Sequence, residues 1–269
     1  MIELLSIPFI QNALLGGIIL AVLLSVLSLF IYLKNWSFIN VGISHATFGG
    51  LAVGFYLGIS PTLFGTIFAV ITGLLIGYIS RKGDIHEDIS IGILFSMSMA
   101  FGVIVITLSP NYNADLFTFL FGNILTIGKE DIYVLIGFTI LSLGFIKLFF
   151  HKIMYCCYNE EVAYTSGINT SFYYYSLILI ISVATVLSVK LVGVILASAM
   201  MILPAAFSNQ IFWHYRKILI FSIISSIFMV VAGIFLSFYY DLPSGATIVL
   251  LYSVLFGILV LAKKFSGRK

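Results

Sequence analysis

The sequence predicts an all-α fold, a polytopic membrane bundle of helices, and three observations support this prediction. The 269 residues are 61% hydrophobic and only 9% charged, and the mean hydropathy is +1.19. A chain of that composition has too little polar surface to cover a soluble core. The apolar runs are long and continuous, without the alternation of a β-strand. Because only helices and closed barrels satisfy backbone hydrogen bonds in lipid, we expect these runs to be membrane helices.

Nine apolar segments are candidate spans. They cover residues 10–33, 41–58, 61–79, 89–109, 132–150, 171–189, 191–208, 218–239 and 246–262. The segment at 191–208 is short and Pro204 interrupts it, because proline lacks the amide proton that an interior helical turn needs. We therefore expect eight or nine transmembrane helices in one domain over residues 1–269, with Pro204 as a hinge.

The basic residues predict the orientation of the chain. If the carboxyl terminus is cytosolic and nine spans alternate, only Lys129 and Lys190 of the 13 Lys and Arg residues lie outside. Cytosolic loops carry such an excess of positive charge. The amino terminus is then external. Met1 to Asn12 lacks the charged start and the cleavage site of a signal peptide, so we expect the first segment to be retained.

His45 is the first candidate for a functional residue. No Asp, Glu, Lys or Arg occurs between residues 35 and 80, so His45 is the one metal-competent side chain in a stretch long enough to cross a bilayer twice. On a helix it shares a face with Gly49, Ala52 and Tyr56. Small residues beside a polar one leave room for a path or for a neighbouring helix. From the residues alone, a hydrogen-bonded packing histidine and a transport residue are equally good interpretations.

The longest cytosolic loop, residues 151–170, carries two features. Asn159 to Gly167 has the pattern of a short amphipathic helix closed by glycine, which a docking element needs and a solvated loop does not. Cys156 and Cys157 are adjacent in the sequence. A vicinal pair is a poor structural disulfide and offers only two metal ligands, so we expect both thiols to be reduced.

Two other function classes find less support. A secondary metal transporter or channel working alone would normally carry buried acids for ion coupling, yet every Asp and Glu lies at a span end or in a loop. An intramembrane enzyme needs paired catalytic groups at membrane depth, and a single histidine does not provide them. The stand-alone transporter is the alternative to a transporter subunit whose energy comes from elsewhere.

Several separated motifs resemble the membrane permease subunits of bacterial ATP-binding-cassette importers for divalent metals, the zinc and manganese group. In chain order the motifs are Ser44-His45-Ala46 with Gly49-Gly50, Ile91 to Ser96, Leu120 to Leu125, Ala163 with Gly167, Lys190 to Ala206, and Asp241 to Ala246. Each motif alone is weak, but together they cover nearly the whole chain. The resemblance implies a type II permease fold, like that of the vitamin B12 importer, in the bacterial cytoplasmic membrane.

The resemblance also implies partners and a cargo. Two copies of the chain would assemble with two cytosolic ATP-binding subunits and an external metal-binding protein, in membrane lipid and without nucleic acid. ATP hydrolysis would occur on the ATPase, since this chain has no phosphate-binding loop, and the chain would bind no cofactor. The loop helix would dock on the ATPase. The implied coupling residues are Glu160, Glu161, Ala163 and Gly167, and the implied metal path passes His45, with Ser44 and Asp241 as weaker candidates.

Val41 departs from the pattern of that family. Many members carry an aspartate four residues before the histidine, a spacing that puts carboxylate and imidazole on one helical face. Val41 cannot ligate, which leaves His45 with the weaker oxygens of Ser44 or Asn40. Imidazole suits zinc better than manganese, which prefers oxygen, so zinc is the favoured cargo, with manganese and iron as alternatives. The sequence leaves open whether Asp88, Asp115 or Asp241 contacts the ion.

Overall fold

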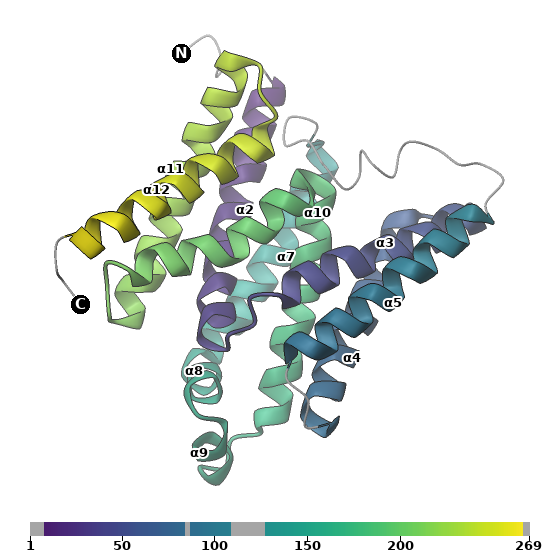
Figure 1. Ribbon diagram of the computed structural model, residues 1–269, viewed down its shortest axis with the longest axis horizontal. Coiled ribbons are helices and arrows are strands. Elements are labelled where there is room, and N and C mark those ends of the chain that lie inside the picture. Colours follow the sequence, from purple (N-terminus) through teal and green to yellow (C-terminus); the bar gives the residue numbers. More distant parts are fainter. Residues whose placement is uncertain (1–7, 84–86, 109–126, 266–269) are drawn as a thin grey trace. The chain divides into compact units, whose positions relative to one another are not determined.

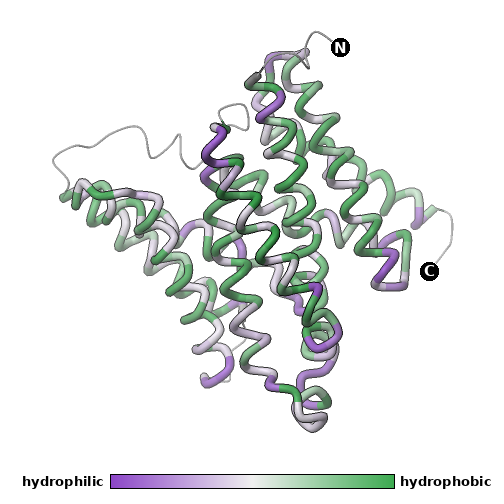
Figure 2. Tube along the Cα trace, turned by 180° about the vertical axis from the view of Figure 1, so that it is seen from behind, coloured by the Kyte–Doolittle hydropathy of each residue, from purple (hydrophilic) through white to green (hydrophobic). Residues whose placement is uncertain are grey.

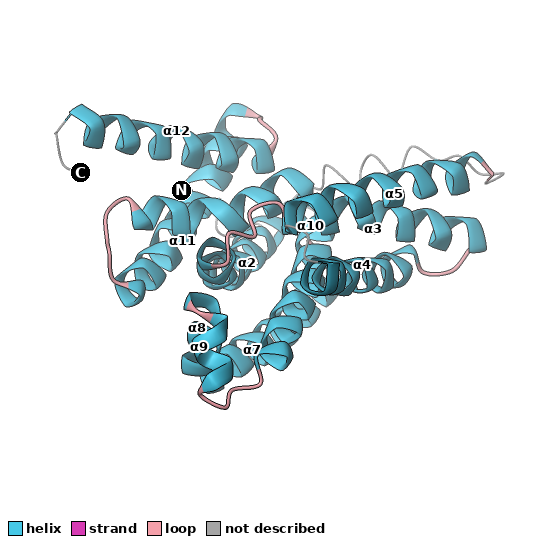
Figure 3. Cartoon of the chain, turned by 60° about the horizontal axis from the view of Figure 1, so that its bottom comes forward, coloured by secondary structure: helices cyan, strands magenta, loops and turns pink. Residues whose placement is uncertain are grey.

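The structure is a computed structural model that describes residues 8–83, 87–108 and 127–265. The helices are α2 (Pro8–Leu33), α3 (Ile39–Leu57), α4 (Pro61–Gly83), α5 (Glu87–Thr107), α7 (Lys129–Leu148), α8 (Phe150–Tyr158), α9 (Glu160–Thr165), α10 (Thr170–Asn209), α11 (Tyr215–Tyr240) and α12 (Ser244–Phe265). In this described part of the chain every regular element is a helix (Figures 1 and 3). The all-helical prediction is confirmed. Asp115 and the motif at 120–125 lie outside the described residues.

In the described ranges, seven helices are long and apolar enough to cross a membrane: α2, α4, α5, α7, α10, α11 and α12. In Figure 2 the hydrophobic colour runs along these helices, and hydrophilic residues gather near their ends. Burial within the chain differs widely between them. The most apolar stretch of α2 is 72% buried, whereas that of α12 is 11% buried. Apolar side chains left exposed in this way can face lipid tails, which are as apolar as they are.

Helix α3 covers the predicted segment 41–58 but is not among those seven, because it is more polar. It contains Asn40, Ser44, His45 and Thr47. Asn40 and Ser44 are 0% exposed, and Thr47 is 1% exposed. Polar side chains at membrane depth face the protein interior rather than lipid. We therefore read α3 as an interior helix whose polar residues are sheltered by its neighbours.

The 40-residue helix α10 contains two of the predicted segments, 171–189 and 191–208. A straight helix of that length would extend about 60 Å, about twice the thickness of the hydrocarbon core. Its non-helical residue is Gly193, with φ 82° and ψ 166°, a conformation that glycine adopts without a steric penalty. Pro204 lies in the helical stretch that follows, where its carbonyl accepts hydrogen bonds from Ser208 (2.7 Å) and Ser222 (3.0 Å). The break is thus at Gly193, and a hinge at Pro204 stays a prediction.

The described helices form two compact units. The first, which we call the α3 unit, contains α3, α4, α5, α8, α9 and α10 up to Lys190. The second, which we call the α11 unit, contains nearly all of α2, most of α7, α10 from Leu191, and α11 and α12. Each unit is described by itself. The prediction of one domain over the whole chain stays a prediction.

Within the α3 unit, close packing of α3 on α4 and α5 depends on glycine. A methyl group at Gly49 would lie 2.9 Å from the carbonyl oxygen of Ser98 in α5, and one at Gly54 would lie 2.6 Å from Cα of Pro61 in α4. Real methyl groups do not approach backbone atoms that closely, so these positions admit no larger residue without a shift. Gly49, on the predicted face of His45, therefore serves the contact with a neighbouring helix.

We expect Gly49→Ala to destabilise the α3 unit. Overpacking of this kind costs about 1–3 kcal/mol, so the purified chain should unfold several degrees lower in detergent when melting is followed by circular dichroism. Gly92→Ala is the matched control, because Gly92 is exposed in the same unit and an added methyl would meet nothing within 4 Å. Equal melting temperatures for the two variants would contradict the close contact at Gly49.

Candidate functional site

His45 lies near the middle of α3 and is half-buried. Its ring is edge-on to Phe95 of α5, with centroids 4.9 Å apart and planes at 85°. The Nδ1 atom is buried and has no hydrogen-bond partner among the described residues. A histidine that serves packing alone would be expected to pair this nitrogen, because an unpaired buried polar atom costs roughly 1–3 kcal/mol. A neutral imidazole can also use such a nitrogen to coordinate a metal ion.

Further buried polar atoms lie on α3 and α5. Ser44 of α3 and Ser90 of α5 are 0% exposed, and their hydroxyls have no partner within the described part of the chain. The buried Asn40 uses its amide oxygen to accept a hydrogen bond from Thr185 of α10, and its amide nitrogen is unpaired among the described residues. Water or an ion that satisfied these atoms would recover part of the free energy lost on burying them.

Among the described residues, acidic side chains are not gathered around a common point. In the described ranges no group of three or more His, Cys, Asp or Glu side chains is placed to hold a metal ion. Asp241 is exposed and belongs to the α11 unit, where it ends α11 with a left-handed backbone, φ 54°. This gives Asp241 a structural role in the turn, and a contact with metal stays a prediction. Asp88 is exposed in the first turn of α5.

The predicted loop helix is present as α9, which follows the nine-residue helix α8. The side chain of Asn159 caps α9 by accepting a hydrogen bond from the Val162 amide at 3.1 Å. After the last turn, Gly167 adopts φ 79°, the conformation that commonly ends a helix. Ala163 is 0% exposed, whereas Val162 is 48% and Tyr164 is 73% exposed. The helix thus turns one small residue inward and presents larger apolar ones outward.

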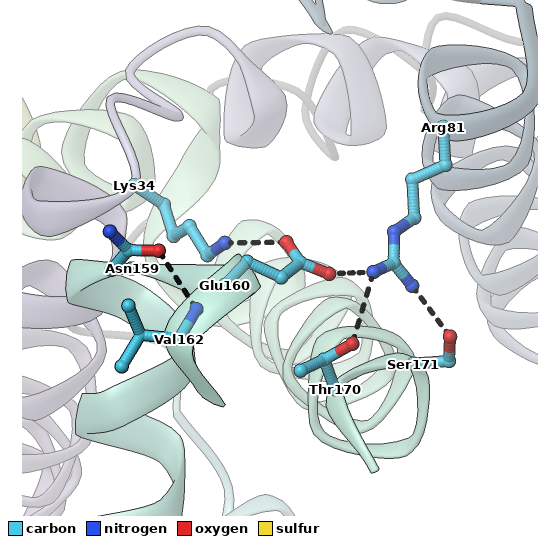
Figure 4. Close-up of polar contacts among 7 residues, drawn as sticks. All are labelled: Lys34, Arg81, Asn159, Glu160, Val162, Thr170 and Ser171. Atoms are coloured by element: carbon cyan, nitrogen blue, oxygen red, sulfur yellow. Dashed lines mark hydrogen bonds and ion pairs between the residues drawn. The ribbon is translucent and has the colours of Figure 1, made fainter. Parts of the chain in front are cut away.

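Glu160 and Glu161 have different surroundings although they are adjacent. Glu161 is exposed. Glu160 is turned towards the ends of other helices, where Lys34 donates to Oε2 at 3.2 Å and Arg81 forms an ion pair with Oε1 (Figure 4). Lys34 lies in the link between α2 and α3, and Arg81 lies in the last turn of α4. One carboxylate therefore joins α9 to two other segments of the α3 unit.

Arg81 extends these contacts to the start of α10. Its Nη1 donates to the hydroxyl of Ser171 at 2.9 Å, and Nη2 reaches the hydroxyl of Thr170 at 3.5 Å (Figure 4). The guanidinium carbon lies 4.5 Å from the ring centroid of Tyr174, within the range of a cation–π interaction. The planar guanidinium suits this arrangement because it offers several donors in a fixed geometry.

Lys34 and Arg81 are functional candidates that reasoning from the sequence missed. They counted there only as cytosolic basic residues, and Lys34 is 126 positions from Glu160. A signal was available, because the predicted topology puts Lys34, Arg81 and the loop that carries Glu160 on the same side of the membrane. It could not identify the pairing, which depends on which helix ends the fold brings together.

Cys156 and Cys157 are free thiols buried in α8, as predicted for a reduced pair. Burial raises the pKa of the Cys157 thiol to about 12 and also raises the pKa of Cys156. Since the thiolate is the reactive form of cysteine, burial keeps both thiols unreactive near neutral pH.

The chain matches the ABC 3 transport family over residues 6–263. It is 33% identical over 256 residues to the manganese transport system membrane protein MntC of Halalkalibacterium halodurans, with 95% of this chain and 88% of that protein covered. It is 32% identical over 248 residues to the manganese import system permease protein ScaB of Streptococcus gordonii, with 92% and 89% covered.

Two solved structures are similar in fold. PsaBC from Streptococcus pneumoniae, in complex with Fab, matches with a TM-score of 0.83 and 30% identity over 96% of this chain and 93% of that chain. An inward-facing structure described as a metal-chelate type ABC transporter matches with a TM-score of 0.74 over 94% and 85% of the two chains. At 14% identity the second likeness concerns the fold alone.

The family match spans nearly the whole chain, so this chain belongs to the ABC 3 transport family. It is a multi-pass membrane permease subunit and not itself the ATPase of the system. The predicted resemblance and the predicted type II permease fold are confirmed. The preference for zinc over manganese is not confirmed.

We expect Cys157 to resist alkylation in the folded chain. A rise in pKa from 9.0 to about 12 lowers the thiolate fraction near neutral pH about 1,000-fold. A Cys156→Ser chain in detergent should therefore incorporate N-ethylmaleimide fully only after unfolding, as mass spectrometry can measure. Tyr158→Cys in a chain without both native cysteines is the exposed control and should label at once. Rapid labelling of native Cys157 would contradict its burial.

Proposed function

We propose that this chain forms the translocation path of an ATP-driven importer that carries a divalent metal ion into the cytosol, with manganese as the cargo. The observation that carries this proposal is His45. It is the metal-competent side chain of a charge-free stretch, it lies on the polar interior helix α3, and its Nδ1 has no partner among the described residues. A transport path that holds an ion only weakly lets the ion leave.

The cargo is assigned to manganese on two grounds. The two relatives described above are named for manganese transport or import. In addition, one imidazole with the oxygens of Ser44 and Asn40 is a weak set of ligands, and manganese is the most weakly held of the common divalent transition metals. Zinc, which a lone imidazole would favour, is the alternative cargo, and iron is a further alternative. Because this ligand set is weak, the choice between metals would be made largely before the ion reaches this chain.

The proposed complex contains two copies of this chain, two cytosolic ATPases and an external metal-binding protein. The carboxyl terminus and α9 lie on the cytosolic side and the amino terminus lies outside. Helix α9 docks on the ATPase through its exposed face, which includes Glu161, Val162 and Tyr164. ATP binding and release then alternate the exposure of the path between the two sides.

We expect His45→Ala to reduce metal uptake at least about tenfold, because it removes the strongest ligand in the path. Uptake of manganese, zinc and iron would be measured in cells that lack their own importers and that express this chain with its ATPase and binding protein. His214→Ala, at an exposed loop histidine, is the matched control. Unchanged uptake by His45→Ala in an assembled, ATP-hydrolysing complex would refute the role of His45, and uptake of zinc alone would refute the manganese assignment.

We expect Val41→Asp to bind the metal more tightly and release it more slowly. The carboxylate would lie one helical turn before His45, on the same face, and would add a strong oxygen ligand. Both the apparent KM and the maximal rate of uptake should fall. Val41→Leu controls for size without adding a ligand. If Val41→Asp and Val41→Leu gave the same kinetics, position 41 would not lie beside the path.

A further inference from the structure

The contacts of Glu160 form an ionic anchor at one end of α9, defined by Glu160, Lys34 and Arg81. The side chains of Lys34 and Arg81 are 15% and 24% exposed, and that of Glu160 is 31% exposed. Solvent therefore screens these charges less than it screens charges on an open surface. A charge-assisted hydrogen bond in such surroundings is stronger than a neutral one.

An aromatic pair supports the two cations of the anchor. The Lys34 ammonium lies 5.7 Å from the ring centroid of Tyr174, and the Arg81 guanidinium lies 4.5 Å from the same centroid. Trp36 packs edge-on against Tyr174 with centroids 5.1 Å apart. Two positive charges face one carboxylate here, and the electron-rich face of Tyr174 offsets part of the remaining charge. The geometry therefore holds both cations close to Glu160.

Helix α9 needs such a connection because it is short. Six residues are too few for a stable isolated helix, and Ala163 is the one residue of α9 that is buried. The Asn159 cap and Gly167 fix the ends of the helix. Neither of these features ties α9 to the membrane helices, whereas Glu160 contacts the link before α3 and the end of α4 directly, and the start of α10 through Arg81.

We propose that Glu160 is a positioning residue that makes α9 move as one body with the cytosolic ends of α4 and α10 and with the link before α3. This inference rests on the proposed function, in which the ATPase moves α9. Glu160 then acts within this chain and not as a contact to the ATPase, while the exposed Glu161 is left for that contact. Loss of the anchor lets α9 follow the ATPase without moving the path, so ATP is hydrolysed without import.

The first arm of the test measures the anchor without any metal. Glu160→Gln keeps the size of the side chain and removes its charge, and we expect backbone amides of residues 159–168 in the purified permease–ATPase complex to exchange hydrogen about tenfold faster. Glu161→Gln should leave this exchange as in wild type. Glu130→Gln, an exposed glutamate in the first turn of α7, is the matched control. Unchanged exchange in Glu160→Gln would overturn the proposal.

The second arm measures coupling as metal imported per ATP hydrolysed in proteoliposomes. We expect Glu160→Gln to lower this ratio about tenfold while the ATPase still co-purifies and stays active. Arg81→Gln leaves the contact of Glu160 with Lys34, so it should lower the ratio less than Glu160→Gln does. The double variant should be no worse than Glu160→Gln alone, because the Arg81–Glu160 pair is already broken there. Additive losses, or loss of the ATPase from Glu160→Gln, would overturn the proposal. Absence of metal import by wild type would instead refute the proposed function, and the exchange arm would still decide the anchor.

Discussion

The structure depends on the need to satisfy polar groups without water, because the hydrocarbon core of a membrane offers no hydrogen-bond partners. Helices satisfy the backbone, and hydroxyl side chains turn back to carbonyls of the preceding turn. Thr47, Ser182, Thr185, Ser188 and Ser208 each donate to the carbonyl four residues earlier. The Nδ1 of His45 and the hydroxyl of Ser44 are among the buried polar atoms that have no partner in the described part of the chain. They lie on α3, whose polar residues Asn40, Ser44 and Thr47 are buried inside the chain.

The same need explains why much of the fold could be predicted. Apart from residue 109 and a few other residues near segment ends, every predicted apolar segment is occupied by a described helix, because a chain crossing lipid satisfies its backbone by forming helices. His45 could be chosen from the sequence because no charged residue lies near it in the chain. The break at Gly193 could not be predicted from the sequence, because the sequence does not show which of the glycines adopts a positive φ. Pro204 was the more visible residue, but the helix continues through it.

The pairing of Glu160 was beyond prediction for a different reason. A local pattern defines a helix and a terminating glycine, and both were visible in residues 159–167. Which cations meet the first carboxylate depends on where distant helices end, and this is set by tertiary packing. The two neighbouring glutamates look equivalent in the sequence and differ in the structure because one faces the chain and the other faces solvent.

The contrast between α2 and α12 has a consequence for how this chain can change over evolutionary time. Both helices are strongly apolar, but most of α2 is enclosed by the chain and most of α12 is not. A substitution in α2 must preserve shape, since enclosed side chains are packed to near-crystalline density. A substitution in α12 must preserve only hydrophobicity where the helix faces lipid. The sequences of related chains should therefore vary more along α12 than along α2, although both helices are strongly hydrophobic in a hydropathy plot.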